Sequence, residues 1–143
     1  MLVKTQIKWS RFDRLVREMA KVILSEYAPR TIVGLARGGL PMATMLSHIL
    51  KKPLVIVSTR SYSGKVRNKL VFEESGLEVV EGPVLIVDEI ADSGETLKRT
   101  IEHYSRFECR TAVLVCKATS SIVPNYAGMY IRGSEWVVFP WEG

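Results

Sequence analysis

The sequence is poor in cysteine and lacks long apolar runs, and both absences narrow the classes of protein it can encode. Its 143 residues include two cysteines, Cys109 and Cys116. They are too few for a disulfide framework and lack the clustered partners of a structural zinc site. We therefore expect buried free thiols and a cytoplasmic protein. No segment is apolar for long enough to cross a bilayer, and the charged start MLVKTQIKWS does not fit a secretory signal, so we expect no membrane partner.

DNA-binding and RNA-binding motifs are also absent, although the chain is basic. A net charge of +5 and a pI near 9.4 suit nucleic acid, an anionic membrane surface or a polyanionic small substrate. Because the basic residues are scattered, nucleic acid is disfavoured as the principal partner. With 47% hydrophobic and 24% charged residues and no repeats or linker, the composition predicts one globular domain over residues 1–143.

Apolar spacing predicts alternating helices and strands. Apolar residues recur at helical spacing from Ser10 to Tyr27, with Ser10 and Asp13 as a candidate capping pair and Pro29 as the terminator. Short apolar runs predict buried strands, and this alternation predicts an α/β fold whose mostly parallel sheet is covered on both faces. The predicted strands are 31–36, 53–59, 83–87 and 111–116, and the later helices are 40–50 and about 94–107.

Two regions depart from this alternation. Residues 60–76 are polar and rich in Lys and Arg, which in a compact domain favours a mobile functional loop. Residues 117–143 end in the aromatic-rich WVVFPWE, and we expect them to form a hood-like tail over one edge of the sheet.

The stretch VLIVDEIADSGETL at 84–97 carries the clearest chemical signal. An apolar strand runs into the acidic pair Asp88 and Glu89, at the strand end where open parallel sheets bind ligands. The turn at 92–96 then supplies backbone N–H groups, two hydroxyls and a helix N-terminus, which together suit a phosphate monoester. The alternative is that Asp92 or Ser93 only caps the helix and that the acidic pair is solvated.

This stretch closely resembles the fingerprint with which type I phosphoribosyltransferases bind phosphoribosyl diphosphate (PRPP): apolar residues, two acidic residues, two apolar residues and D-T-G-x-T. The resemblance implies the family's fold, with a small C-terminal hood. It implies that Asp88 and Glu89 bind the ribose hydroxyls. It also implies that they hold Mg²⁺, mainly through PRPP and water rather than by direct ligation. Glu95 would be repelled by a phosphate, so we expect it to point into solvent. The residues implied to surround the 5′-phosphate or contact PRPP are Ile90, Ala91, Asp92, Ser93, Gly94, Glu95 and Thr96.

Taken alone, the turn ARGGLP at 36–41 is a common kind of glycine-containing turn that ends a strand. In the family, a similar turn at this point of the chain grips the departing pyrophosphate. The resemblance therefore implies this role for Arg37, whose guanidinium can bind phosphate bidentately, and for the backbone amides of Gly38 and Gly39. Basic residues of the predicted loop, namely Lys65, Arg67 or Lys69, would assist them.

Further residues resemble the xanthine-guanine and hypoxanthine-guanine branch of the family. They are Trp9-Ser10, Ser61-Tyr62 at the start of the predicted loop, and Lys117 followed by the late EWVVFPWE. The resemblance implies that Lys117 donates to the purine 6-oxo group, that Trp136 stacks on the base and that backbone atoms beside Val137 read its edge. A 6-amino group cannot accept from an ammonium, which disfavours adenine.

Simpler interpretations of these residues stay open. Lys117 could be an exposed lysine at a strand end, and Trp136 with Trp141 could serve packing or a subunit contact. Val138 stands where some relatives carry an acidic side chain, so recognition of the purine 2-substituent is undetermined.

The resemblance implies that N9 of a 6-oxopurine attacks C1′ of PRPP, giving a nucleoside monophosphate and pyrophosphate in purine salvage. Asp92 would accept or share the N7 proton. A homo-oligomer, either a dimer or a tetramer, is expected. The alternative from another class is a regulator that keeps the PRPP fold, senses nucleotides and binds nucleic acid. An adenine or orotate transferase is disfavoured by Lys117 and the WVVFPWE ending.

Overall fold

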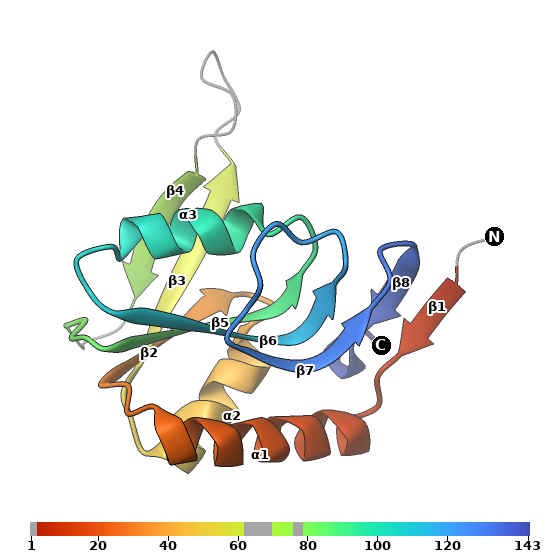
Figure 1. Cartoon of the computed structure of the whole chain (residues 1–143), viewed down its shortest axis with the longest axis horizontal. Helices are drawn as coiled ribbons and strands as arrows, with labels where there is room; N and C mark the ends of the chain where they lie inside the picture. The colour runs from red at the N-terminus through yellow and green to blue at the C-terminus, as the bar shows by residue number, and fades with distance from the viewer. Residues whose placement is uncertain (1–2, 62–69, 76–78) are drawn as a thin grey trace.

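Six strands form one sheet in the order β4-β3-β2-β5-β6-β7 (Figure 1). The computed structural model describes residues 3–61, 70–75 and 79–143. Neighbouring strands are parallel except for the antiparallel pair β3 and β4. The predicted α/β fold with a mostly parallel sheet is therefore confirmed. The strands are β2 (Thr31–Ala36), β3 (Leu54–Ser61), β4 (Leu70–Ser75), β5 (Val84–Ala91), β6 (Cys109–Lys117) and β7 (Tyr126–Ile131).

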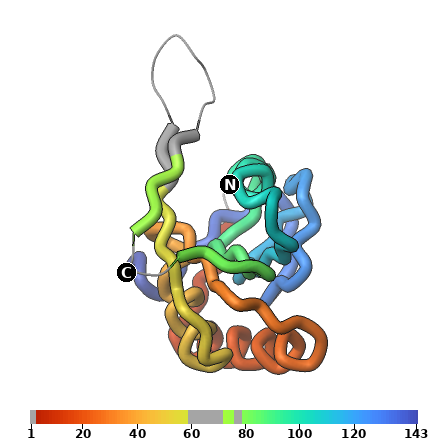
Figure 2. Tube along the Cα trace, turned by 90° about the vertical axis from the view of Figure 1, so that its left-hand side faces the viewer, coloured from red at the N-terminus to blue at the C-terminus, as the bar shows by residue number. Residues whose placement is uncertain are grey.

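Helices cover both faces of this sheet. Helices α1 (Trp9–Glu26) and α2 (Leu40–Leu50) lie on one face and α3 (Glu95–His103) lies on the other, as two perpendicular views show (Figures 1 and 2). Alternate residues of a strand point to opposite faces. Ile32 and Leu85 accordingly join the core with α1 and α2, whereas Val33 and Ile86 join the core with α3. Burial on both faces explains why these strands are apolar throughout.

A second, two-stranded sheet is formed by the two ends of the described chain. Strand β1 (Val3–Gln6) pairs in parallel with β8 (Glu135–Val138), and the short helix η1 (Pro140–Glu142) follows. The backbone N–H of Ile7 donates to the Val138 carbonyl at 2.9 Å and continues the pairing. Strand β1 was not predicted. The predicted hood over 117–143 is wrong for β7, which belongs to the main sheet.

The ends of the predicted elements differ from the observed ones. Helix α1 begins at Trp9 with Lys8 as its N-cap and no side-chain capping bond, so the predicted cap by Ser10 and Asp13 is wrong. Ser10 already lies inside the helix, and Asp13 instead accepts from the Arg17 guanidinium at 3.0 Å. Helix α3 ends at His103 rather than near residue 107.

The range 60–76 contains a strand that the sequence analysis missed. Strand β4 pairs with β3 from Ser61↔Leu70 to Ile56↔Ser75, so the predicted loop is wrong for residues 60–61 and 70–75. Residues 62–69 and 76–78 lie outside the described residues. The Phe72 ring stacks on His103 with centroids 4.3 Å apart, and the Tyr104 hydroxyl donates to Glu74 Oε1 at 2.7 Å. The end of α3 thus holds β4 in place.

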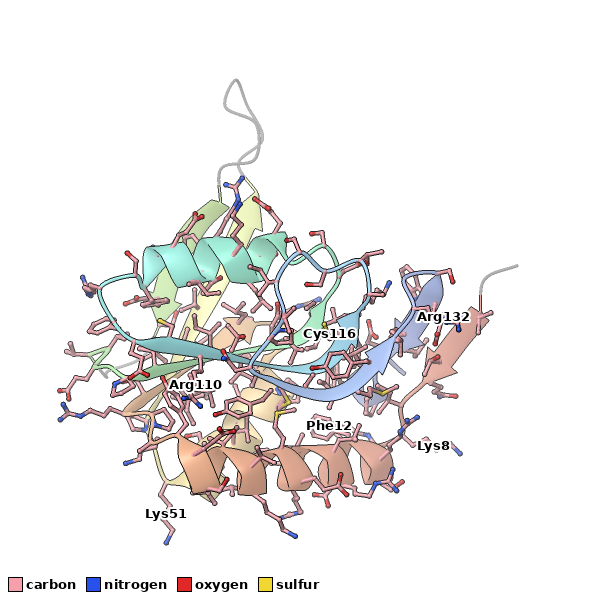
Figure 3. All side chains as sticks on the ribbon, viewed as in Figure 1. Lys8, Phe12, Lys51, Arg110, Cys116 and Arg132 are labelled. Carbon is pink, nitrogen blue, oxygen red and sulfur yellow. The ribbon has the colours of Figure 1, made fainter. Side chains whose placement is uncertain are left out.

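Both cysteines are free, as expected. Cys116 is buried in the sheet (Figure 3), Cys109 is half-buried, and burial raises the pKa of both thiols. In the part of the chain that the structure describes, no helix is long and apolar enough to cross a membrane.

Removal of the Tyr104 hydroxyl tests the attachment of β4. Tyr104→Phe should lower the free energy of unfolding by about 1 kcal/mol, because one hydrogen bond to a carboxylate is lost while the ring stays packed. Urea denaturation measures this change. Tyr130→Phe, at a tyrosine that is 66% exposed, is the control and should change little. Equal stabilities for both variants would show that the bond to Glu74 does not stabilise the fold.

Candidate functional site

A cavity of about 590 Å³ opens where β2, β5 and β6 reach their carboxyl ends and where β8 and η1 lie against them. Parallel strands place their carboxyl ends at one edge of a sheet, which is where such sheets bind ligands. The sequence-predicted residues Arg37, Gly38, Glu89, Ile90, Asp92, Lys117, Trp136 and Val137 all line it. The structure therefore brings together residues from four separate segments.

The turn after β2 lies unusually close to β5. A Cβ atom at Gly39 would lie 2.7 Å from the carbonyl oxygens of Leu35 and Val87, and one at Gly38 would overlap the Glu89 carboxylate. At Gly39, where the neighbours are backbone atoms, only glycine permits this approach. The exposed Arg37 is thereby held beside the acidic residues of β5, and the Ala36–Arg37 peptide is cis.

The acidic pair lies within β5, which continues beyond the predicted end to Ala91. Asp88 is buried, and its Oδ1 accepts from the Glu89 backbone N–H at 2.8 Å. Burial, with the neighbouring Glu89, raises the pKa of Asp88 to about 8. Burial and then the charge of Glu142 raise the pKa of Glu89. The two carboxyl groups therefore form an acidic cluster that a cation would stabilise.

Asp88 and Glu89 can supply only part of a Mg²⁺ coordination shell, so a bound ligand and water would have to complete it. Carboxylate oxygens suit Mg²⁺, which commonly takes one or two carboxylates and completes its shell with substrate oxygens and water. Among the described residues, no group of three or more His, Cys, Asp or Glu side chains could hold a metal ion. Asp88 and Glu89 are consequently suited to a metal that arrives with, or is completed by, a ligand.

The turn between β5 and α3 encloses a smaller pocket of about 180 Å³, lined by the whole segment 88–97. Gly94 has a φ of 86° and is the N-cap of α3, so neither Asp92 nor Ser93 is the cap residue. Glu95 is exposed and accepts from Arg99 at 2.8 Å, as expected for a side chain directed into solvent. Backbone N–H groups at the start of α3 give this pocket the character of an anion site.

The loop after β6 supports this turn, a contact that the sequence analysis missed. A Cβ atom at Gly94 would lie 2.8 Å from both the Ile122 nitrogen and Ser120 Oγ. The backbone N–H and the hydroxyl of Ser121 donate to the Ser93 carbonyl at 2.8 and 2.9 Å. No local signal predicts these contacts, because the two segments meet only after β5 and β6 have paired.

Lys117 and Asp92 form an ion pair in the large cavity, and Asp92 also lines the smaller pocket. Lys117 is only 9% exposed, so its interpretation as an exposed strand-end lysine is wrong. Its Nζ lies 3.5 Å from Asp92 Oδ2, which is long for a charge-assisted bond. The Asp92 side chain is 64% exposed, and its backbone carbonyl accepts from the Thr119 hydroxyl at 3.0 Å. A buried ammonium with three donors is thus available to an acceptor in the cavity.

Aromatic residues of β8, of η1 and of the residue between them form part of the cavity wall. Trp136 is 58% exposed and Val137 is buried, and both line the cavity. Phe139, Trp141 and Glu142 line it as well, and none of them was predicted as a site residue. Phe139 and Trp141 stack with centroids 5.0 Å apart. The aromatic-rich ending was the available signal, but it did not show which rings face the cavity.

Two predicted site residues cannot be placed. Arg67 and Lys69, and Lys65 with them, lie outside the described residues. Gly39 does not line the cavity. It packs against the backbone of β5 at Val87 and Asp88.

Comparisons with known proteins agree with this arrangement. Residues 6–142 match the sequence model of a family described as the phosphoribosyl transferase domain. The crystal structure of a purine phosphoribosyltransferase from Pyrococcus horikoshii Ot3 superposes with a TM-score of 0.83 at 34% identity, covering 99% of this chain and 96% of that chain.

One curated relative is named as a transcriptional regulator and another as an enzyme. The transcriptional regulator GfcR of Thermoplasma acidophilum is 27% identical over 128 residues, which are 86% of this chain and 63% of the regulator. The xanthine-guanine phosphoribosyltransferase of Cereibacter sphaeroides is 28% identical over 124 residues, which are 79% of this chain and 69% of that enzyme. The chain thus spans less than two thirds of the regulator's length.

The raised pKa of Asp88 predicts a pH-dependent stability in the ligand-free protein. The ordinary pKa is 3.8 and the folded-state value is about 8. Between these values the folded state binds the extra proton, so the free energy of unfolding should fall as the pH rises from about 4 to about 8. Asp88→Asn should flatten this dependence, as measured by urea denaturation without divalent cations. Asp13→Asn, at an exposed carboxylate, should not. Parallel pH profiles for wild type and Asp88→Asn would contradict the prediction.

Proposed function

The chain belongs to the phosphoribosyltransferase family, and on that premise we propose that it transfers the 5-phosphoribosyl group of PRPP to N9 of a 6-oxopurine. The products would be a nucleoside monophosphate and pyrophosphate. The observation that carries this proposal is the pairing of buried Lys117 with Asp92 in a cavity walled by aromatic rings. A donor, a carboxylate and a stacking surface are the groups needed to hold a 6-oxopurine and take its proton.

The phosphates of PRPP have two complementary places. The pocket at 88–97 lies at the start of α3 and suits the 5′-phosphate, because a helix N-terminus favours an anion. Arg37 and the backbone of Gly38 border the larger cavity and suit the pyrophosphate, because a guanidinium binds phosphate oxygens bidentately. Asp88 and Glu89 lie between these places and suit the ribose hydroxyls.

The base would lie between Lys117 and the aromatic wall. The Lys117 ammonium donates to the 6-oxo group and has no acceptor with which to receive a 6-amino group, so adenine is rejected. Trp136 offers an exposed ring for stacking. Backbone atoms beside the buried Val137 would read the edge of the ring.

Asp92 would handle the proton released by the attacking base. Its carboxylate lies beside Lys117 and is exposed to the cavity, where it accepts or shares the N7 proton and raises electron density in the ring. The positive charge that develops on the sugar is stabilised by the same acidic edge. Asp88 and Glu89 would hold Mg²⁺ mainly through PRPP and water, and this ion when bound supplies positive charge to the leaving pyrophosphate.

Several finer features belong to the same proposal. Residues 1–143 would act as one domain within a homo-oligomer, a dimer or a tetramer, in cytoplasmic purine salvage. Arg67 and Lys69 would add positive charge around the pyrophosphate.

A second candidate function is a nucleotide-sensing regulator that binds nucleic acid. It is favoured by the similarity to the transcriptional regulator GfcR. The same cavity could bind a nucleotide without turning it over. A base panel with PRPP and Mg²⁺ separates the candidates. Pyrophosphate release that depends on guanine, xanthine or hypoxanthine and not on adenine supports the transferase. Tight, salt-sensitive binding of DNA or RNA without turnover supports the regulator.

Asp92→Asn tests the proton-handling role. The change is isosteric and preserves the exposed turn, but it removes the carboxylate charge, so turnover should fall by about 10²-fold or more. Steady-state kinetics with the preferred base measure this. Glu95→Gln alters an exposed carboxylate of the neighbouring turn and should keep most of the activity. Wild-type turnover in Asp92→Asn would exclude Asp92 as the proton acceptor.

Lys117→Met tests the contact with the 6-oxo group. Methionine keeps a flexible side chain of similar length, and the Asp92 carboxylate that it leaves behind stays hydrated, so the fold should persist. Binding of the base should weaken by about 1–3 kcal/mol because a buried acceptor loses its donor. Calorimetric titration with base and separately with PRPP measures both affinities. Lys98→Met, at an exposed lysine, is the control. An unchanged base affinity in Lys117→Met would place Lys117 outside the base site.

A further inference from the structure

The aromatic wall of the large cavity is attached to the N-terminal segment of the chain. Within the described residues, β8 pairs with β1 and not with the six-stranded sheet. The chain passes from β1 through Ile7 and Lys8 directly into α1. The position of the wall therefore depends on β1 and on the first turn of α1.

Four aromatic rings join the first turn of α1 to this wall. The Trp141 ring contacts Phe139, Phe12 and Trp9, with centroid separations of 5.0, 5.4 and 6.2 Å. The Trp9 ring also meets the edge of Phe12 at 5.7 Å. Phe12 lies on the side of α1 that faces the sheet (Figure 3). Trp141 is the one ring in this group that contacts α1 and also lines the cavity beside Trp136.

Trp9 differs from the other members of the group by its exposure. It is 57% exposed, whereas Phe12 and Phe139 are 4% and 6% exposed. It does not line the large cavity but borders a separate one of about 410 Å³ with Ile7, Lys8 and Phe139. Trp9 has two ring contacts, one with the buried Phe12 and one with Trp141, and the second of these reaches the cavity wall directly.

We propose that Trp9 is a positioning residue for the base site, which holds the Trp141 indole in place as part of the cavity wall. This inference rests on the proposed function, because it assumes that a planar purine occupies the cavity. Stacking on a purine requires a wall whose rings keep one orientation, since a ring that reorients loses its contact with the base. Trp9 would restrain Trp141 through this ring contact, and it does not itself line the cavity.

The test is a set of variants at Trp9 compared by kinetics and by equilibrium binding. Trp9→Ala should raise the KM for the base, and the Kd of guanosine monophosphate, about three- to tenfold, the value of one aromatic contact. The kcat and the KM for PRPP should stay within about twofold, because the phosphate sites do not contact this ring. Trp9→Phe should restore most of the affinity. Near-ultraviolet circular dichroism should show loss of the Trp9–Trp141 contribution in both variants.

Val22→Ala is the matched control, at an apolar residue of the same helix that is 49% exposed. It should leave the KM for the base unchanged. A loss of thermal stability shared by Trp9→Ala and Trp9→Phe, with base affinity unchanged, would overturn the inference and make Trp9 a stability residue. A rise in the KM for PRPP equal to that for the base would overturn it as well.

Failure of the proposed function would be recognised by a different measurement, made on the wild-type protein. If the wild type shows no base-dependent release of pyrophosphate, the transferase proposal fails. The inference is then decided by the Kd of guanosine monophosphate alone. A weaker Kd in Trp9→Ala than in the wild type supports it, whereas equal affinity or no binding to either protein overturns it.

Discussion

The contact between the turn after β2 and the backbone of β5 is the constraint on which the site depends. Gly39 lies against the Val87 carbonyl, and Gly38 lies against the Glu89 carboxylate. Strands β2 and β5 are neighbours in the sheet although β3 and β4 separate them in the sequence. The strand order therefore places Arg37 and Glu89 in one cavity. A side chain at Gly39 would clash with the backbone of both strands and separate the two halves of the site.

Charge is distributed unevenly around the cavity. Asp88, whose pKa burial raises to about 8, lines the smaller pocket, and Glu89 lines both pockets. Burial and then the charge of Glu142 raise the pKa of Glu89. The basic residues of the large cavity are the exposed Arg37 and the buried Lys117, which pairs with Asp92. Burial of a charged group costs free energy unless a partner of opposite charge is present.

The two termini of the described chain build the wall that closes the cavity. The pairing of β1 with β8 and the ring contacts of Trp9, Phe12 and Trp141 attach this wall to α1. Val137 and Phe139 of the wall also pack in the buried core that contains Leu85 and Val87 of β5. The wall is therefore a separate sheet that packs on the same core as the main sheet.

The sequence by itself determined the α/β class, the buried parallel strands β2, β3, β5 and β6, and most of the residues that line the large cavity. Strands buried on both faces are continuous apolar runs, and the motif 84–97 is contiguous, so both are visible locally. Only the tertiary structure decided the rest. Strand β4 pairs at the margin of the main sheet and β1 pairs outside it, where composition carries little signal. The burial of Lys117, the support of Gly94 by the loop after β6 and the exposure of Phe139, Trp141 and Glu142 to the cavity depend on pairing between distant segments. Such contacts exist only once the strands are in register, and so no local pattern predicts them.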